Sequence, residues 1–220
     1  MKLSHFYTIR LVLLLAVTCF SSTIYATAKW ELKKNQNGIK VYTALFPNSS
    51  IKAVRVECQL QGTITQLAAL LLDIKAHEKW VYTNETSYTI QKLADNEIIY
   101  YAAMDLSWPL SDRDAVIRIK LTQDSLTKAL HVSSTSLPGY VPIKKDKVRV
   151  PLIKIDWTAT PVSNNTLQVV YEAQADPGGV VPAWAVNMFA TKGPYETFLA
   201  LNSLLNSGAY KGIKVPFVKE

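Results

Sequence analysis

The chain has 220 residues, 49 % of them hydrophobic, and a formal net charge of +7 at neutral pH. That length makes one domain with a core of its own, and two cysteines are too few for a disulfide framework. The positive charge suits an anionic membrane surface or a solvated face, and it gathers in two places, at Lys144, Lys145, Lys147 and Arg149 and at Lys211, Lys214 and Lys219.

Residues 1–28 have the pattern of an export signal. Lys2 and Arg10 precede the apolar run Leu11–Phe20, and a small-x-small sequence of the kind that signal peptidase cleaves ends at Ala28. The run is shorter than the span of about 20 apolar residues that a membrane helix needs, so an uncleaved anchor is the weaker alternative. We therefore expect an exported protein, periplasmic if the host is Gram-negative and otherwise secreted, with no nucleic-acid partner.

Past the signal, alternation of apolar and polar residues predicts strands with one face on a core. The stretch from Val54 to Leu60 alternates in this way, and Ile39 to Thr43 is expected to pair with it. Between Thr63 and Trp80 the apolar spacing becomes helical, with a second short helix at His77 to Trp80. These two helices are expected to cap the sheet.

A series of strands follows, separated by turns rich in Asp, Asn and Ser. They are predicted at Thr86–Lys92, Ile98–Leu106, Arg113–Leu121, Lys128–Ser136, Val148–Thr160 and Leu167–Ala175. The proline-rich segment Leu137–Pro142 is expected to be a loop over one end of this antiparallel meander. A last helix is predicted from Pro182 to about Leu205, bent at Gly193-Pro194. Separate runs of strands and helices indicate the α+β class.

Two stretches of the chain carry a family resemblance. Trp108–Asp114 (WPLSDRD) opens a strand, and Asp176–Trp184 (DPGGVVPAW) opens the last helix. In this order and spacing they resemble a START domain over roughly Trp30 to Leu205. The resemblance implies a helix-grip fold, in which a curved antiparallel sheet wraps around a long C-terminal helix and encloses a hydrophobic tunnel for a lipid. The domain is expected at residues 29–210, with a basic tail at 211–220.

The resemblance assigns Arg113 and Asp114 a structural part, an ion-pair brace at the corner where the strand begins. Arg113→Ala is expected to cost roughly 2 to 4 kcal/mol if its carboxylate partner stays buried. Some sterol-carrying relatives place a buried acid and base on these strands, and the matching positions here hold Tyr100 and Ile119. That charged pair is therefore missing, which leaves Tyr100 as a lone hydroxyl partner for a ligand.

The expected ligand-binding residues share the inward face of successive strands and of the last helix. They are Tyr100, Ala102, Met104, Ala115, Ile117, Ile119, Trp157, Tyr171, Trp184, Met188 and Phe189. The same residue types would line an ordinary filled core, and the sequence leaves that alternative open. The entrance is expected at one of two places, beside aromatic rings suited to transient contact with a membrane. These gates are Pro138, Gly139 and Tyr140, or Gly178 and Gly179.

The function inferred from these features is the binding and non-covalent transport of a lipid or other hydrophobic ligand by a monomer. His77 and His131 have no ligand spacing to each other or to Cys58, and no nucleophile motif is present, so we expect no metal, cofactor or catalytic residue.

Two alternatives to a lipid carrier stay open. Related helix-grip proteins cyclise polyketides, and an enzyme of that kind would need polar groups inside the cavity. The candidates are Tyr100, Asp105, Tyr171 and Glu172, of which the two tyrosines are expected to point inward. A protein-binding module is the other alternative, and it would present an exposed apolar patch instead of an enclosed cavity.

Overall fold

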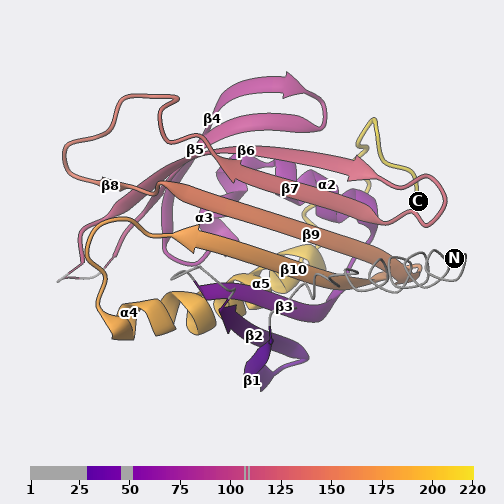
Figure 1. Ribbon diagram of the computed structural model, residues 1–220. Coiled ribbons are helices and arrows are strands. Elements are labelled where there is room, and N and C mark those ends of the chain that lie inside the picture. The colour runs from indigo at the N-terminus through magenta and orange to yellow at the C-terminus, as the bar shows by residue number, and fades with distance from the viewer. Residues whose placement is uncertain (1–28, 46–51, 107, 109) are drawn as a thin grey trace, which may run out of the picture.

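The computed structural model describes residues 29–45, 52–106, 108 and 110–220. The expected export signal at residues 1–28 lies outside this described part. One large sheet faces the viewer in Figure 1, and the helices lie behind it and along its lower edge. Among the described residues, no helix combines the length and the apolar character needed to cross a bilayer.

The described chain forms ten strands in a single sheet. They are β1 (Glu31–Gln36), β2 (Ile39–Leu45), β3 (Lys52–Gln61), β4 (Asn84–Ala94), β5 (Glu97–Met104), β6 (Arg113–Gln123), β7 (Leu130–Ser136), β8 (Val148–Arg149), β9 (Leu152–Ser163) and β10 (Thr166–Asp176). Their order is β1-β2-β3-β10-β9-β7-β6-β5-β4, with antiparallel neighbours, while β8 pairs in parallel with β6 (Figure 1). The last long strand therefore joins the first three strands to the rest of the sheet.

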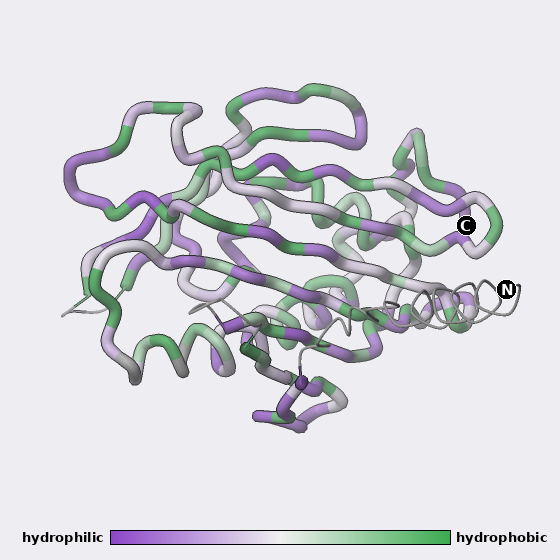
Figure 2. Tube along the Cα trace, viewed as in Figure 1, coloured by the Kyte–Doolittle hydropathy of each residue, from purple (hydrophilic) through white to green (hydrophobic). Residues whose placement is uncertain are grey.

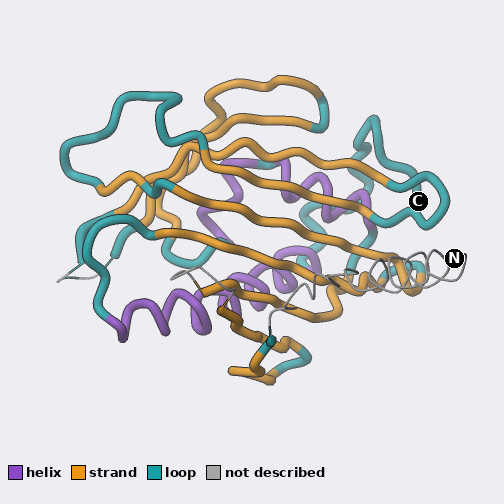
Figure 3. The backbone as a smooth tube through the Cα atoms, viewed as in Figure 1, coloured by secondary structure: helices purple, strands orange, loops and turns teal. Residues whose placement is uncertain are grey.

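The helices fall into two groups along the chain. They are α2 (Ile64–Leu72), the 3-10 turn Ile74–Ala76 and α3 (His77–Trp80), and later α4 (Ala183–Asn187), the π-helical turn Met188–Lys192 and α5 (Gly193–Asn206). A capping box starts α2, since the Thr63 hydroxyl accepts from the Gln66 N–H and the Gln66 side chain accepts from the Thr63 N–H. Figure 3 shows both groups on the same side of the strands.

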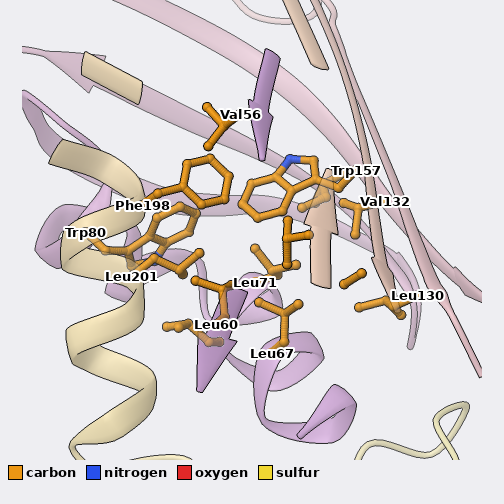
Figure 4. Close-up of a cluster of buried hydrophobic side chains, with 14 of the residues drawn as sticks. Val56, Leu60, Leu67, Leu71, Trp80, Leu130, Val132, Trp157, Phe198 and Leu201 are labelled. Carbon is orange, nitrogen blue, oxygen red and sulfur yellow. The ribbon is translucent and has the colours of Figure 1, made fainter. Parts of the chain in front are cut away.

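The main core lies between the sheet and these helices. Along most of the long strands, hydrophilic and hydrophobic residues alternate (Figure 2), so that the face of the sheet toward the helices is apolar. Figure 4 shows the two sides meeting, with Phe198 and Leu201 of α5 and Leu67 and Leu71 of α2 near Trp157 of β9. Phe198, Leu201 and Leu67 are fully buried.

This architecture confirms the predicted α+β, helix-grip fold, including the pairing of β2 with β3 and the two helices after Thr63. The predicted interruption of the last helix is a π-helical turn directly before Gly193-Pro194. Pro194 has no N–H to bond to the Ala190 carbonyl, which is the usual origin of such an irregularity.

Three sequence expectations need correction. The single strand Val148–Thr160 is wrong: Pro151 separates β8 from β9, and the two pair with different neighbours. The edge strand β1 was missed because its residues are mostly exposed and do not alternate. Residues 211–220 are not a free tail, since Val215 is buried in the main core and Phe217 packs against it.

Candidate functional site

Two adjoining cavities lie between the sheet and the C-terminal helices. The central cavity, with a volume of about 260 Å³, is bounded by β5, β6, β9, α3 and α5. The end cavity, about 380 Å³, is bounded by β3, β9, β10, α4 and the turn after β10. Residues that line both are Met104, Ile153, Tyr171, Phe189 and Pro194. Two chambers with a shared wall therefore lie where the tunnel is expected, and the end cavity alone reaches the range of about 300 to 1,000 Å³ that is typical of ligand pockets.

The register of β5 against β6 explains why the central cavity is not filled. Ala102 is paired with Ala115, and Tyr100 with Ile117, on the inward face. Two alanines directly opposite each other place only methyl groups where larger side chains would meet. The six residues predicted from these strands all line this cavity: Tyr100, Ala102, Met104, Ala115, Ile117 and Ile119.

An aromatic cluster forms the opposite wall. The Trp157 ring lies 5.1 Å from Tyr171 and 5.0 Å from Phe198, between centroids, and the Tyr171 and Phe198 centroids are 5.3 Å apart. Trp157 and Tyr171 meet edge to face, an arrangement that aromatic quadrupoles favour. The predicted residues Trp157, Tyr171 and Phe189 therefore belong to the site.

Two predicted ligand-binding residues of the last helix are not placed at the cavities. Trp184 is 51 % exposed and lines neither chamber. The side chain of Met188 lies outside the described part of the structure. Of the polar groups named for a cyclase, Tyr100 and Tyr171 point inward, whereas Asp105 is exposed and Glu172 pairs with Arg55 on the outside, 2.8 Å from its Nε.

A group of polar side chains in the wall of the central cavity was not predicted from the sequence. His77, Trp80, Thr83 and Asn84, from α3 and the turn after it, all line this cavity. The His77 Nε2–H donates to the Leu71 carbonyl at 3.0 Å, and burial lowers the His77 pKa to about 4. At neutral pH the ring is uncharged. Short-range patterns contain no signal for these residues, because the fold of the turn decides their direction.

The expected brace at the start of β6 exists, but its ion pair joins different residues. Asp114 is fully buried and accepts two hydrogen bonds from Arg149, at 2.7 Å from Nε and 3.1 Å from Nη2. Arg113 instead donates to backbone carbonyls, those of Ser111, Pro177 and Gly178. The parallel pairing of β8 with β6 places Arg149 directly opposite Asp114.

The basic cluster expected at residues 144–149 is consequently not one exposed surface. Arg149 is buried, and Lys147 pairs with Asp112 at 3.0 Å. Lys144 lies over the Tyr101 ring, 4.3 Å from its centroid. Hydrogen bonds from the Leu106 N–H and from Lys147 hold the pKa of Asp112 below its ordinary value.

The loop after β7, one of the two expected gates, covers the other face of the sheet. Leu137 and Val141 pack against Tyr101 and Val116, which point away from the cavities. Arg149 holds the loop there through the carbonyls of Pro138, Val141 and Pro142. The gate residues of this loop line neither cavity: Pro138, Gly139 and Tyr140.

The second expected gate borders the end cavity. Asp176 and Pro177 line it, and Gly178 and Gly179 follow at once, with φ values of 66° and 61° that suit glycine. The Gly178 N–H donates to the Asp176 carboxylate at 2.9 Å. This turn therefore links the end of β10 to the brace at the start of β6.

An exposed apolar surface surrounds this end of the molecule. Trp108 is 92 % exposed, Val180 94 % and Trp184 51 %. Just beneath them, Leu106 and Leu110 of the β5–β6 loop form a small core with Ala185 of α4. We call Trp108, Val180 and Trp184 the apolar end surface. The sequence motif contained Trp108 but did not reveal its exposure.

Comparison with known proteins agrees with this geometry. A family model, the START domain, matches residues 20–207. The crystal structure of a STAR-related lipid transfer protein from Xanthomonas axonopodis is 32 % identical, with a TM-score of 0.74 over 80 % of this chain and 98 % of that one. An uncharacterized protein of Pseudomonas aeruginosa is 29 % identical over 86 % of this chain and 96 % of its own length. The phosphatidylcholine transfer protein of Bos taurus is 28 % identical over 76 % of this chain and 79 % of its own.

Proposed function

Because the chain belongs to the START domain family, whose members bind lipids, we propose that it takes up one lipid or similar hydrophobic molecule in its two cavities and carries it without covalent chemistry. The observation that carries this proposal is the pair of adjoining cavities between the sheet and α5, whose walls consist mainly of aliphatic and aromatic side chains. Its START relatives named for lipid transfer are not enzymes, and the proposal assigns no catalytic residue.

The physical basis is the replacement of water by an apolar wall. Moving a sixteen-carbon chain into water costs roughly 13 kcal/mol, at about 0.8 kcal/mol for each CH2. Such a lipid leaves a membrane very slowly unless an equivalent apolar surface receives it. Ile117, Ile119 and Ile153 of the central cavity offer that surface, so the carrier lowers the barrier by substituting one apolar environment for another.

Export and membrane contact are further parts of the proposal. Export is supported by the sequence of residues 1–28 and would place the carrier outside the cytoplasm, in the periplasm of a Gram-negative host. Membrane contact is supported by the apolar end surface, because large exposed apolar side chains in one place commonly mark a docking site. The end cavity reaches this part of the molecule, because Leu106 lines that cavity and packs with Leu110 and with Ala185 of α4.

Mass spectrometry of the protein purified from its own host tests the proposal directly. Native conditions should give a mature chain that begins after Ala28 and carries one lipid per protein. Solvent extraction would then identify that lipid. A chain that is empty in every preparation, or one that retains residues 1–28, contradicts the corresponding part of the proposal.

A matched pair of substitutions links the lipid to the cavity. Ile117→Trp places an indole in the central cavity and is expected to abolish the bound lipid with little change in melting temperature. Val116 is its neighbour on the packed outer face, so Val116→Trp should cost about 1 to 3 kcal/mol of stability through overpacking. Lipid retained by Ile117→Trp would place the ligand elsewhere.

A further inference from the structure

Three buried polar atoms in residues of the central cavity wall lack any hydrogen-bond partner in the described structure. They are Trp80 Nε1, Thr83 Oγ1 and Asn84 Oδ1. Trp80 is 5 % exposed and Asn84 7 %. A buried polar group without a partner is destabilising, and native proteins nearly always supply one from protein, water or ligand. One donor, one hydroxyl and one acceptor are therefore left unsatisfied in neighbouring residues that line one cavity.

These atoms come from a single short segment whose backbone is fixed. Thr83 has a φ of 59°, which is strained for a β-branched residue, and its carbonyl accepts from the Asp105 N–H at 3.0 Å. The Tyr82 N–H donates to the Thr197 hydroxyl at 3.0 Å. The Asn84 Nδ2 already donates to Ser87 Oγ at 2.5 Å. These hydrogen bonds hold the backbone of the segment in place from several sides.

The rest of the central cavity wall adds polar groups but no charge. The Tyr100 and Tyr171 hydroxyls have no hydrogen bond within the described residues, and burial raises the pKa of both. The two phenols therefore keep their protons and are neutral, and His77 is neutral because its lowered pKa leaves it without the second ring proton. No Asp, Glu, Lys or Arg is among the described residues that line this cavity.

The end cavity differs, because its wall contains Lys52, Arg113 and Asp176. A charged group moved into the central cavity would lose its hydration and meet no opposite charge, which is costly. A quaternary ammonium could be drawn to aromatic faces, but Trp157 is already engaged in edge-to-face contacts with Tyr171 and Trp80, at interplanar angles of 90° and 88°. The wall fits an uncharged group that both donates and accepts hydrogen bonds.

We propose that the turn from Trp80 to Asn84 binds the uncharged polar end of the ligand, and that the ligand is a lipid whose buried end is a hydroxyl or an amide. The proposal rests on the lipid-binding function above and specifies its substrate class. Trp80 Nε1 and the Thr83 hydroxyl donate to the oxygen of that group, while Asn84 Oδ1 accepts from its O–H or N–H. The alkyl part then lies along Ala102, Ala115 and Ile117.

A set of probes with one alkyl chain and different ends tests this class. Hexadecanol, hexadecane, hexadecyl phosphate and hexadecylphosphocholine are compared by their competition with a fluorescent alkyl probe bound to the intact protein. We expect hexadecanol to bind at least about tenfold more tightly than hexadecane, which corresponds to about 1.4 kcal/mol. Both charged probes should bind more weakly than the alcohol.

Two conservative variants assign the preference to the turn. Trp80→Phe removes the indole N–H and keeps an aromatic ring, and Thr83→Val removes only the hydroxyl. Each should weaken hexadecanol binding several-fold, as expected for one hydrogen bond, and should therefore lower the preference for hexadecanol over hexadecane. Trp157→Phe is the matched control, because it trims a tryptophan of the same cavity that is not among the unsatisfied groups; it should affect both probes alike. Thr83→Val should not lower the melting temperature, since it deletes an unsatisfied atom.

The outcomes separate this inference from the proposed function. If hexadecane and hexadecanol bind equally well, or if Trp80→Phe weakens both alike, the polar subsite is overturned while lipid binding stands. Tighter binding of hexadecylphosphocholine or hexadecyl phosphate than of the alcohol overturns the uncharged class. If no probe binds, the proposed function itself fails.

Discussion

Asp114 and Arg149 illustrate how this protein tolerates charge in its interior. Both side chains are almost fully buried, and the guanidinium meets the carboxylate through two hydrogen bonds. Its remaining donors reach three carbonyls of the loop after β7. Arg149 therefore neutralises the Asp114 carboxylate and also holds that loop on the outer face of the sheet.

Loss of Arg149 should be far more damaging than loss of Lys147, whose carboxylate partner Asp112 is 31 % exposed, whereas that of Arg149 is fully buried. Arg149→Ala leaves the Asp114 carboxylate buried without a partner, which is expected to cost about 3 to 5 kcal/mol. Lys147→Ala, which removes the more exposed pair with Asp112, should cost at most about 1 kcal/mol. Urea denaturation of the two variants measures both. Equal denaturation midpoints for the two variants would show that the Arg149–Asp114 pair contributes no more stability than the Lys147–Asp112 pair.

Sequence reasoning found the inward residues of β5 and β6 but paired the brace incorrectly. Alternation is a local property, and it correctly placed Tyr100, Ala102 and Ile117 on one face. The partner of Asp114 is 35 positions away and is brought there by the two-residue strand β8. So short a parallel pairing has no periodicity to detect. The polar residues after α3 also lie in a segment too short to have a detectable periodicity.

At the scale of elements, the turn between β10 and α4 depends on two glycines with different surroundings. A Cβ on Gly178 would lie 3.2 Å from the Arg149 carbonyl and from Pro151 Cδ. A Cβ on Gly179 would make an ordinary contact, 3.7 Å from Val148 Cγ1. Both residues have a left-handed backbone conformation, so the backbone cost of alanine is the same at either position. A difference in stability between the two alanine variants therefore reports the difference in steric contact.

Alanine at these two positions should therefore have unequal effects. Gly179→Ala is expected to cost roughly 1 to 2 kcal/mol for the left-handed conformation alone. Gly178→Ala should cost at least about 1 kcal/mol more, because it also overpacks the end of β8. Chemical unfolding of both variants under the same conditions gives the comparison. Equal losses would mean that Val148 and Pro151 yield without strain.

Element prediction succeeded where one face of the element is buried and failed elsewhere. Whereas β5 is a continuous apolar run buried on both faces, the strands β3 and β6 and the helix α2 have clear periodicity because one face of each packs on the core. The edge strand β1 has none. Between β8 and β9 the apolar pattern continues through Pro151, so a change of neighbouring strand went unnoticed.

At the scale of the whole molecule, the apolar end surface and the opposite end of the sheet differ in their expected contact with membranes. Trp108 precedes β6, whereas Leu126, which is 90 % exposed, follows the other end of that strand. Burying a large apolar side chain in the membrane interface gains about 1.5 to 3 kcal/mol. The end near Trp108 has three such residues.

Membrane contact should consequently fall when this surface is made polar. We expect Trp108→Ala combined with Val180→Ser to slow lipid transfer between vesicles by about tenfold or more, with equilibrium lipid binding unchanged. Leu126→Ser is the control and should transfer lipid at the wild-type rate. Fluorescent lipid transfer between two vesicle populations reports the rates. Unchanged transfer by the double variant would exclude this end as the docking site.

The strand order has a consequence for how the chain is assembled. β3 pairs with β2 on one side and with β10 on the other, where Gln61 lies opposite Thr166. During synthesis, the second side of β3 stays without a neighbour until more than half of the chain has followed, and such long-range closure is slow. An unfinished sheet edge invites pairing with other molecules. A nascent copy of this protein thus depends on protection until its final strand has emerged.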